Sequence, residues 1–158
     1  MPTPDELVQT GKLERFAPDL LPGDLECRRL FMMPRVVTYF QETLPGLASD
    51  GYVSGALTPL DQADEFLSAF ARGDQWFQMP PHSMKPEDLG IWELCTSDLR
   101  FFGWFWRQGT FIISAVGLAG QTKDKGLYPG YRAQAVNDRL TLDLDPPPFI
   151  TGKLTDVL

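Results

Sequence analysis

The sequence has few of the residues from which metal and redox sites are usually built. Its 158 residues include two cysteines, Cys27 and Cys95, and a single histidine, His82. The cysteines form no CxxC pair, so we expect no zinc or iron–sulfur site, no metal ligands and no cofactor. Cys95 is interpreted as a small buried residue and His82 as a loop residue. Free thiols are the default for a cytoplasmic chain, which is the location we expect.

The sequence also lacks long apolar segments. No run approaches the roughly eighteen apolar residues that a membrane span requires, so no association with a membrane is expected. The N-terminal stretch MPTPDELVQTGKLERF contains acids and prolines in place of an apolar core, which is not typical of a secretory signal. We find no internal repeat and no low-complexity run. The length predicts a single domain over residues 1–158.

Positive charge is scarce in the first half of the chain. The formal net charge is −7. Residues 1–90 contain seven Lys/Arg and fourteen Asp/Glu, whereas residues 91–158 contain seven of each. A negative chain is a poor general ligand for nucleic acid, because neutralisation of phosphates dominates such binding. Within 91–141 there are six basic and four acidic residues, so we expect a mildly basic surface behind an acidic front half.

Local signals in the first ninety residues predict mostly helices. Thr3 and Glu6 have the spacing of a capping box, and apolar residues recur at helical spacing after Pro34 and again after Thr58. The expected elements are a short helix after Thr3, an imperfect strand within 24–32, a helix over 34–44, a helix over 59–72 ended by Gly73, and a proline-rich loop over 78–90.

Aromatic residues are concentrated in residues 91–117, which read IWELCTSDLRFFGWFWRQGTFIISAVG and contain three of the four tryptophans. The pattern predicts three strands, Ile91–Cys95, Arg100–Arg107 and Thr110–Val116, with a two-residue hairpin turn between the last two. Because the middle strand is apolar on both faces, Trp104 is predicted to belong to the core and not to stack on nucleic acid bases.

A loop over 117–130, a helix over 131–140 and an irregular tail follow the meander. Helices that precede an antiparallel meander predict an α+β fold. We therefore expect a small antiparallel sheet, consisting of the three-strand meander and a candidate N-terminal strand, packed on a helical hairpin. The second face of the sheet is left for the last helix, the tail or a ligand.

Residues 90–139 resemble the RelE/ParE toxin superfamily, in its HigB-like, phage-derived branch. The shared pattern is a Leu-Trp-Glu-Leu-Arg-like strand, an Arg-aromatic-aromatic strand, a strand of Ile, Leu and Phe after a glycine turn, a lysine-rich loop and a helix ending in an alternating Ala/Arg pattern. The resemblance is best over 59–140. It divides the chain into an N-terminal extension (1–23), a toxin-like core (24–141) and the tail (142–158).

The resemblance implies a toxin-like protein of a toxin–antitoxin or prophage system. Many members are ribosome-dependent mRNA endoribonucleases that need no metal, and others bind gyrase. In the ribonucleases the ribose 2′-hydroxyl attacks, Arg and Lys stabilise the phosphate, and Lys, Tyr or a similar group moves the protons. The implied partners are an antitoxin or host protein and the ribosome with its mRNA. The candidate catalytic residues are Arg100, Lys123, Lys125 and Tyr128, and the candidate substrate-binding residues are Arg107, Tyr131, Arg132 and Arg139.

Each candidate has a structural alternative. Arg100 is also a strand-end residue that could pair with Asp98 or Glu93, and the lysines would suit a solvated loop. The two tyrosines would also serve to pin that loop to the sheet. Arg132 and Arg139 share a helical face that could bind phosphate, an acidic partner or a neighbouring aspartate.

Departures from the family pattern leave a second function open. Cys95 stands where relatives often have Arg, and Asp124 separates the paired lysines. The alternative is a non-catalytic binding or inhibitor protein on the same fold, whose acidic half engages a basic protein surface.

Overall fold

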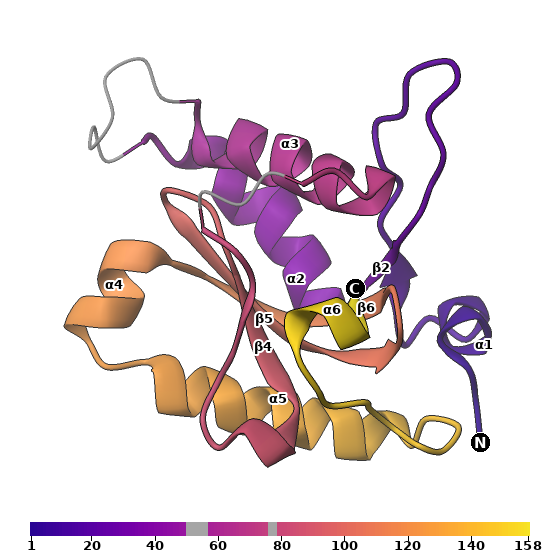
Figure 1. The fold of residues 1–158 in the computed structure, drawn as a ribbon. Coiled ribbons are helices and arrows are strands. Elements are labelled where there is room, and N and C mark those ends of the chain that lie inside the picture. Colours follow the sequence, from indigo (N-terminus) through magenta and orange to yellow (C-terminus); the bar gives the residue numbers. More distant parts are fainter. Residues whose placement is uncertain (50–56, 76–78) are drawn as a thin grey trace.

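A six-stranded mixed sheet forms the centre of the protein (Figure 1). The computed structural model describes residues 1–49, 57–75 and 79–158. The strands lie in the order β1-β2-β6-β5-β4-β3. Their bounds are Glu14–Arg15 (β1), Arg29–Met32 (β2), His82–Ser83 (β3), Ile91–Cys95 (β4), Leu99–Arg107 (β5) and Thr110–Leu118 (β6). Strands β2 and β6 pair in parallel, and the other neighbouring strands pair antiparallel.

The predicted α+β class and the predicted meander, β4-β5-β6, are confirmed, but the sheet is larger than expected. The strand expected within 24–32 is β2, which joins the sheet by its parallel pairing with β6. The loop interpretation of 78–90 is wrong at His82 and Ser83, which form the edge strand β3. Residue 78 lies outside the described residues. A two-residue edge strand has too few residues for a period-2 pattern, and its pairing comes from the free edge of β4.

The helical segments are Pro4–Gln9 (α1), Pro34–Thr38 (α2), Pro59–Arg72 (α3), Ala119–Asp124 (α4), Tyr128–Leu142 (α5) and Leu154–Val157 (α6). The capping box at Thr3 is confirmed by the hydrogen bonds that it exchanges with Glu6, 2.8 Å and 3.3 Å long. Thr58 caps α3, and Gly73 ends it in the left-handed conformation, as expected.

Three other helix predictions need correction. The helix expected over 34–44 changes from α2 to a π-helical turn over Tyr39–Thr43 and then to a 3-10 turn over Leu44–Gly46. The segment expected to be a loop contains α4, and the last helix begins earlier than expected, at Tyr128. Pro129 explains the earlier start, because proline is well tolerated in the first turn of a helix.

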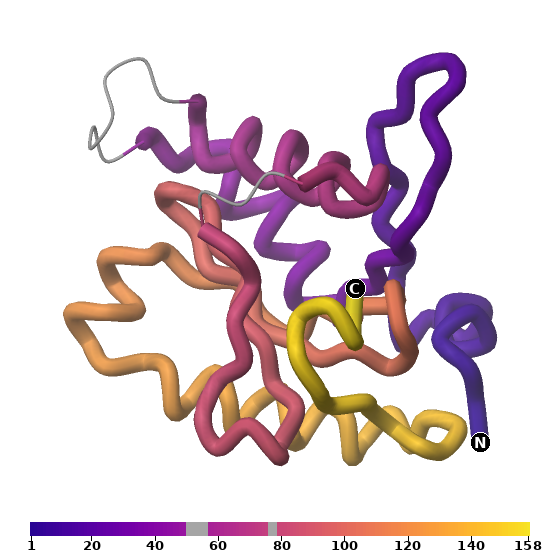
Figure 2. Tube along the Cα trace, viewed as in Figure 1, coloured from indigo at the N-terminus to yellow at the C-terminus, as the bar shows by residue number. Residues whose placement is uncertain are grey.

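Helices cover both faces of the sheet (Figures 1 and 2). On one face, Phe66 of α3 stacks on Phe101 of β5 with ring centroids 6.0 Å apart. On the other face, Tyr131 of α5 stacks on Phe102 of the same strand with centroids 4.6 Å apart. Trp104 is fully buried, which confirms its predicted place in the core. The second face is therefore occupied largely by α5, one of the expected alternatives.

A buried carboxylate links α2, β6 and α5. Asp138 of α5 is 3% exposed and accepts hydrogen bonds from Arg35, Ser114 and Gln134. Arg35 also donates to the carbonyl of Ser114, 3.0 Å away. Buried charges are tolerated when they are paired and hydrogen-bonded, and this set satisfies that requirement. The contacts fix α5 against the part of β6 that extends beyond β2.

The C-terminal tail is more ordered than expected. The amide of Ile150 donates to the carbonyl of Phe105, and Val157 of α6 is fully buried. Arg107 donates to the carbonyl of Pro147 at 2.6 Å. The tail thus packs against the end of the β5–β6 hairpin. Backbone groups of the tail bond to residues far away in the chain, and such contacts leave no periodic pattern in the sequence.

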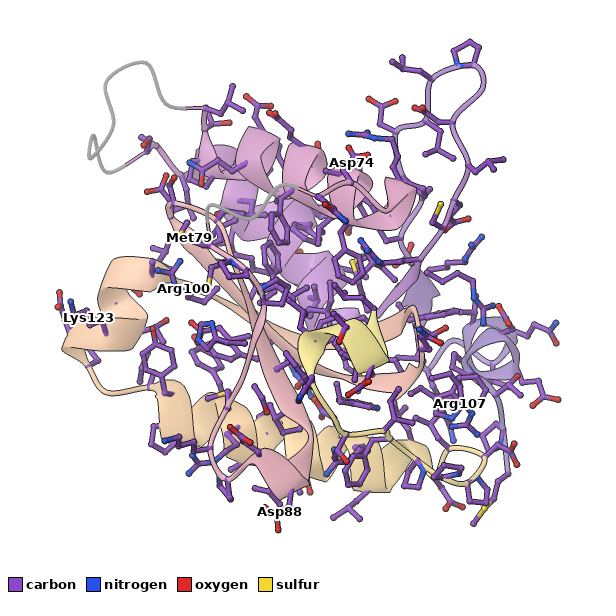
Figure 3. All side chains as sticks on the ribbon, in the orientation of Figure 1. Asp74, Met79, Asp88, Arg100, Arg107 and Lys123 are labelled. Atoms are coloured by element: carbon purple, nitrogen blue, oxygen red, sulfur yellow. The ribbon has the colours of Figure 1, made fainter. Side chains whose placement is uncertain are left out.

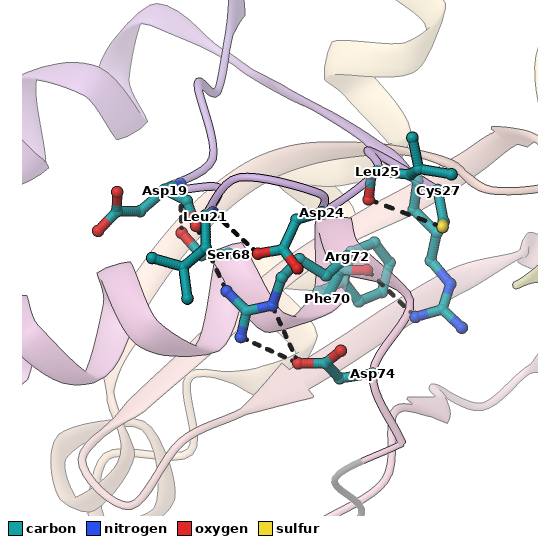
Figure 4. A network of polar contacts seen from close by, with 10 residues as sticks. Asp19, Leu21, Asp24, Leu25, Cys27, Ser68, Phe70, Arg72 and Asp74 are labelled. Atoms are coloured by element: carbon teal, nitrogen blue, oxygen red, sulfur yellow. Dashed lines mark hydrogen bonds and ion pairs between the residues drawn. The ribbon is translucent and has the colours of Figure 1, made fainter.

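The segment between β1 and β2 projects from the body as an arm (residues 16–28; Figures 1 and 2). Its base is fastened to α3: the amide of Asp19 donates to Ser68 Oγ, 2.9 Å away, and Arg72 reaches the carbonyl of Asp19 (Figure 4). At the tip, the amide of Leu21 donates to the carboxylate of Asp24 at 2.9 Å. Leu21 and Leu25 are about three-quarters exposed.

Candidate functional site

A cluster of polar side chains lies on the α5 side of the sheet, within an otherwise apolar layer. Strand register assembles it: His82 of β3 is opposite Glu93 of β4, and Cys95 of β4 is opposite Arg100 of β5. Because side chains alternate along a strand, Glu93 and Cys95 point to the same face. Tyr128, at the start of α5, completes the group. We call these five residues the polar cluster.

The centre of the polar cluster is an ion pair between an exposed imidazole and a buried carboxylate. Nε2 of His82 lies 2.7 Å from Oε2 of Glu93. The His82 side chain is 58% exposed, whereas that of Glu93 is 6% exposed. The hydrogen bond with Glu93 is the main cause that raises the pKa of His82, and it outweighs burial, which lowers it. Glu93 therefore favours the protonated form of a solvent-accessible imidazole.

Arg100 occupies the other oxygen of the same carboxylate. Its Nε lies 3.2 Å from Oε1 of Glu93, and its Nη1 donates to the carbonyls of Thr96 (2.6 Å) and Leu99 (2.9 Å). Of the two predicted partners, the structure shows Glu93 and not Asp98, which accepts instead from Gln62. Arg100 is thus held in place by its own strand end as well as by Glu93.

Cys95 is buried, as expected. Burial and, after it, the negative charge of Glu93 raise the pKa of the Cys95 thiol to about 12, although Arg100 opposes the shift. A thiol in this state is a weak nucleophile. Ligand atoms of His82, Glu93 and Cys95 nevertheless all lie within 4.8 Å of one another, and they are the residues in the cluster that could hold a metal ion.

Two tyrosines of α5 border the polar cluster. The ring of Tyr128 meets Phe102 edge-on, with centroids 5.9 Å apart. Burial and then the charge of Glu93 raise the pKa of Tyr128, while its hydrogen bond to Arg100 lowers it. Tyr131 approaches β6 at Gly117, where a Cβ atom would lie 2.6 Å from the tyrosine hydroxyl. Both tyrosines do fasten the start of α5 to the sheet, as the structural alternative predicted.

The two candidate lysines lie at the C-terminal end of α4, outside the contacts that define the polar cluster. Lys123 is in the last turn of α4 and Lys125 directly follows that helix, and both are exposed. Figure 3 shows Lys123 projecting from α4 on the side of the molecule where Arg100 lies. Lysines at this position would add positive charge to the side of the molecule where Arg100 lies.

The other three candidate arginines bind backbone carbonyls elsewhere. Arg132 donates to the carbonyl of Lys85, and Arg139 to that of Leu89. These two do share one helical face, but that face is turned to the segment before β4. Arg107 lies over the ring of Trp106 and holds the tail. The structure does not bring these arginines into the polar cluster.

Sequence reasoning missed His82 and Glu93, although Glu93 gave a signal. It is the one charged residue in β4, a strand whose five residues are all buried. A buried charge requires a partner, so a glutamate in such a strand predicts a cation on the neighbouring strands. His82 gave no comparable signal, because a two-residue strand between prolines has no pattern of its own.

The polar cluster combines the groups needed to move protons next to an anionic ligand: an exposed imidazole, a carboxylate, a phenol and a fixed guanidinium. No protein-family model, curated protein or solved structure matches the chain significantly. The chemistry of the cluster is therefore the basis for assigning a function. Among the described residues, no helix is long and apolar enough to cross a membrane.

Proposed function

We propose that this protein is a metal-independent, toxin-like endoribonuclease that acts on mRNA at the ribosome. The observation that carries the proposal is the polar cluster: His82 and Arg100 hold opposite oxygens of Glu93, and Tyr128 lies beside Arg100. The order of strands, lysine-bearing segment and helix from β4 to α5 supports it, because that order is the one on which the resemblance to the RelE/ParE toxins rests.

Cleavage of RNA by its own 2′-hydroxyl needs a base, an acid and a cation. The base removes the proton of the attacking hydroxyl, and the acid supplies a proton to the 5′ oxygen that leaves. In the polar cluster, His82 is the exposed group that would exchange protons with the RNA, and the buried carboxylate of Glu93, hydrogen-bonded to it, would accept and return the proton. Both proton transfers of the proposed reaction would thus pass through this pair.

The guanidinium of Arg100 supplies the cation. The phosphate gains negative charge as the new bond forms, and a donor already fixed in position stabilises that charge without rearranging. Arg100 is fixed by the carbonyls of Thr96 and Leu99, and its side chain is 18% exposed. The phenol of Tyr128, which is hydrogen-bonded to Arg100, would donate a hydrogen bond to a second phosphate oxygen.

Substitution of the acid–base pair tests the proposal. Inducible expression of the unchanged protein in bacteria is expected to arrest growth and to leave cleaved transcripts. His82→Asn and Glu93→Gln should each reduce cleavage by about 10²–10⁴-fold, the usual contribution of a general acid or base. Glu87→Gln, an exposed acid on the turn before β4, is the matched control and should remain toxic. Normal growth with intact mRNA, at good expression of the unchanged protein, would contradict the proposal.

The arm favours the alternative of a non-catalytic binding protein. It exposes Leu21 and Leu25, and its charged side chains from Asp19 to Glu26 are all acidic. The contacts of Asp19 with α3 and of Leu21 with Asp24 give the arm a fixed shape before any partner is bound (Figure 4). An apolar tip flanked by acids suits a basic protein surface with an apolar depression.

Sedimentation with ribosomes separates the two functions. The ribonuclease should co-sediment with purified ribosomes, and this association should weaken steeply as salt is added. The binding protein should instead form a stoichiometric complex with a protein partner, with no ribosome co-sedimentation. In that case Leu21→Asp combined with Leu25→Asp should abolish the complex, and His82→Asn should leave it intact.

A further inference from the structure

Three ligand types that zinc prefers meet within the polar cluster. The imidazole of His82, the carboxylate of Glu93 and the thiol of Cys95 place their ligand atoms within 4.8 Å of one another. We propose that these three side chains bind a zinc ion, with the exposed side of His82 leaving a fourth position for water, and that the ion inhibits the enzyme. The inhibition rests on the proposed function, whereas the binding does not.

The sheet supplies the rigidity that such a site needs. Glu93 and Cys95 are two residues apart on β4, and His82 is held opposite Glu93 by the β3–β4 pairing. A zinc ion with bonds of about 2.0–2.3 Å needs its ligand atoms roughly 3.5 Å apart. Side-chain rotations that move these atoms by about 1 Å would therefore close the site. No backbone rearrangement is required. Three protein ligands and one open position are the usual set at accessible zinc ions.

Arg100 competes for Glu93 without closing the site. Nε of Arg100 lies 3.2 Å from Oε1, whereas His82 contacts Oε2 of the same carboxylate. The ion would bind at the Oε2 side, between His82 and Cys95. Arg100 keeps its two carbonyl acceptors, Thr96 and Leu99, even if it withdraws from Glu93. Its positive charge weakens binding, so we expect a dissociation constant of about 1 µM, well short of the affinity of closed structural zinc sites.

The ligand set selects the metal. Thiolate and imidazole ligands favour zinc and cobalt over magnesium and calcium, which prefer oxygen ligands. The buried thiol faces the carboxylate of Glu93, whose negative charge disfavours a thiolate without a cation and would attract a divalent cation. Coordination deprotonates a thiol outright. Bound zinc would thus replace the proton between His82 and Glu93 as well as that of Cys95.

Inhibition follows from the same atoms. The ion takes Nε2 of His82 and an oxygen of Glu93, the two groups that move protons in the proposed reaction. It leaves neither group free to donate or accept a proton. Zinc should therefore stop cleavage by occupying the acid–base pair.

A cobalt titration of the purified full-length protein tests binding without RNA. Cys27 is the other cysteine of the chain and is exposed, so all measurements use a Cys27→Ser background that removes adventitious thiol binding. Cobalt should give one equivalent of binding with sulfur-to-cobalt charge-transfer absorption, and zinc should displace it. Millimolar magnesium should not displace the cobalt.

Variants of the ligands give the decisive comparison. Cys95→Ser should abolish the charge-transfer band, and His82→Asn should weaken zinc binding at least about tenfold, equivalent to 1.4 kcal/mol. His82 is exposed, so its replacement leaves the core intact and remains informative if Cys95→Ser does not fold. Binding that persists undiminished in His82→Asn, or that is already absent from the Cys27→Ser protein, would overturn the site.

Two readouts keep the zinc site and the ribonuclease distinct. Cleavage by the Cys27→Ser protein should fall as zinc saturates the site and recover when a chelator is added. If zinc binds as described but the protein has no ribonuclease activity, the result supports the zinc site and contradicts the proposed function. Zinc that stimulates cleavage would overturn both the inhibition and the metal-independent reaction.

Discussion

The ring of Tyr131 lies almost parallel to that of Phe102, at an angle of 12°, with the two ring centroids 4.6 Å apart. This stack fixes the start of α5 on the sheet, next to the polar cluster. It is possible because β6 has a glycine at position 117, where the tyrosine hydroxyl comes closest to the backbone. The position of Tyr128, one turn earlier on α5, depends on this contact.

Gly117→Ala should therefore disturb the polar cluster from a distance. The added Cβ would lie 2.6 Å from the hydroxyl of Tyr131 and 3.0 Å from Oγ1 of Thr122, so the Tyr131 side chain must shift and disturb its stack on Phe102. We expect a loss of about 1–3 kcal/mol in the free energy of unfolding, as for other overpacked sites, and a larger relative loss of RNA cleavage. Gly120→Ala, which meets nothing within 4 Å, is the control and should be neutral or stabilising. Equal stability of the two variants in urea would contradict the close approach.

Trp104→Ala should strongly destabilise the protein. Trp104 is fully buried in the middle of the central strand β5, and comparable truncations cost about 3–5 kcal/mol. That loss is a large part of the total stability of an ordinary domain, about 5–15 kcal/mol. Leu140→Ala, at a position 73% exposed, should stay within about 0.5 kcal/mol of the unchanged protein. A Trp104→Ala protein that keeps its melting temperature but loses ligand binding would show that the core assignment is wrong.

Asp138→Ala should destabilise the protein more than removal of a surface carboxylate. The buried carboxylate accepts hydrogen bonds from Arg35, Ser114 and Gln134, and bonds to a charged group are worth about 1.5–3 kcal/mol. Asp5, whose ion pair with Arg29 is largely exposed, is the matched control, and Asp5→Ala should cost at most about 1 kcal/mol. Chemical denaturation of both variants measures the difference. Similar midpoints would mean that the buried network contributes little.

Lys123→Ala should weaken association with ribosomes in a salt-dependent way. A lysine that neutralises one phosphate contributes about one to the slope of log affinity against log salt, and its removal should lower that slope by the same amount. Lys153→Ala, an exposed lysine of the tail, is the control and should not change the slope. Co-sedimentation at several salt concentrations gives the slopes. Identical slopes for both variants would place Lys123 of α4 outside the contact with RNA.

The sequence predicted the elements whose signals are local. Caps at Thr3 and Thr58, the helix end at Gly73 and the three strands of the meander each depend on a few neighbouring residues, and the structure confirms them. The core position of Trp104 followed from the apolar residues on both faces of the middle strand.

What the sequence could not supply was pairing between distant segments. Strand β3 exists because the edge of β4 pairs with it, and β2 joins the sheet through β6, which lies far away in the chain. The polar cluster depends on these pairings. The low counts of cysteine and histidine argued against a metal site. Strand register nevertheless brings His82 to Glu93 and Cys95, and spacing along the chain does not show this. Two of the candidate site residues, Arg100 and Tyr128, lie in the polar cluster. Arg100 is on the face of the sheet that α5 covers, and Tyr128 lies at the start of α5.

The parallel pairing of β2 with β6 also sets an order of events during synthesis. Residues 29–32 pair with residues 110–113, so β2 has no partner on that side until the ribosome has added about eighty more residues. At roughly 5–20 residues per second, the delay is roughly 4–16 s. Tyr128 follows later still, so the polar cluster is incomplete while the chain is being made. A nascent chain therefore carries an open strand edge and a polar cluster without Tyr128, and the complete cluster exists only once translation has passed into α5.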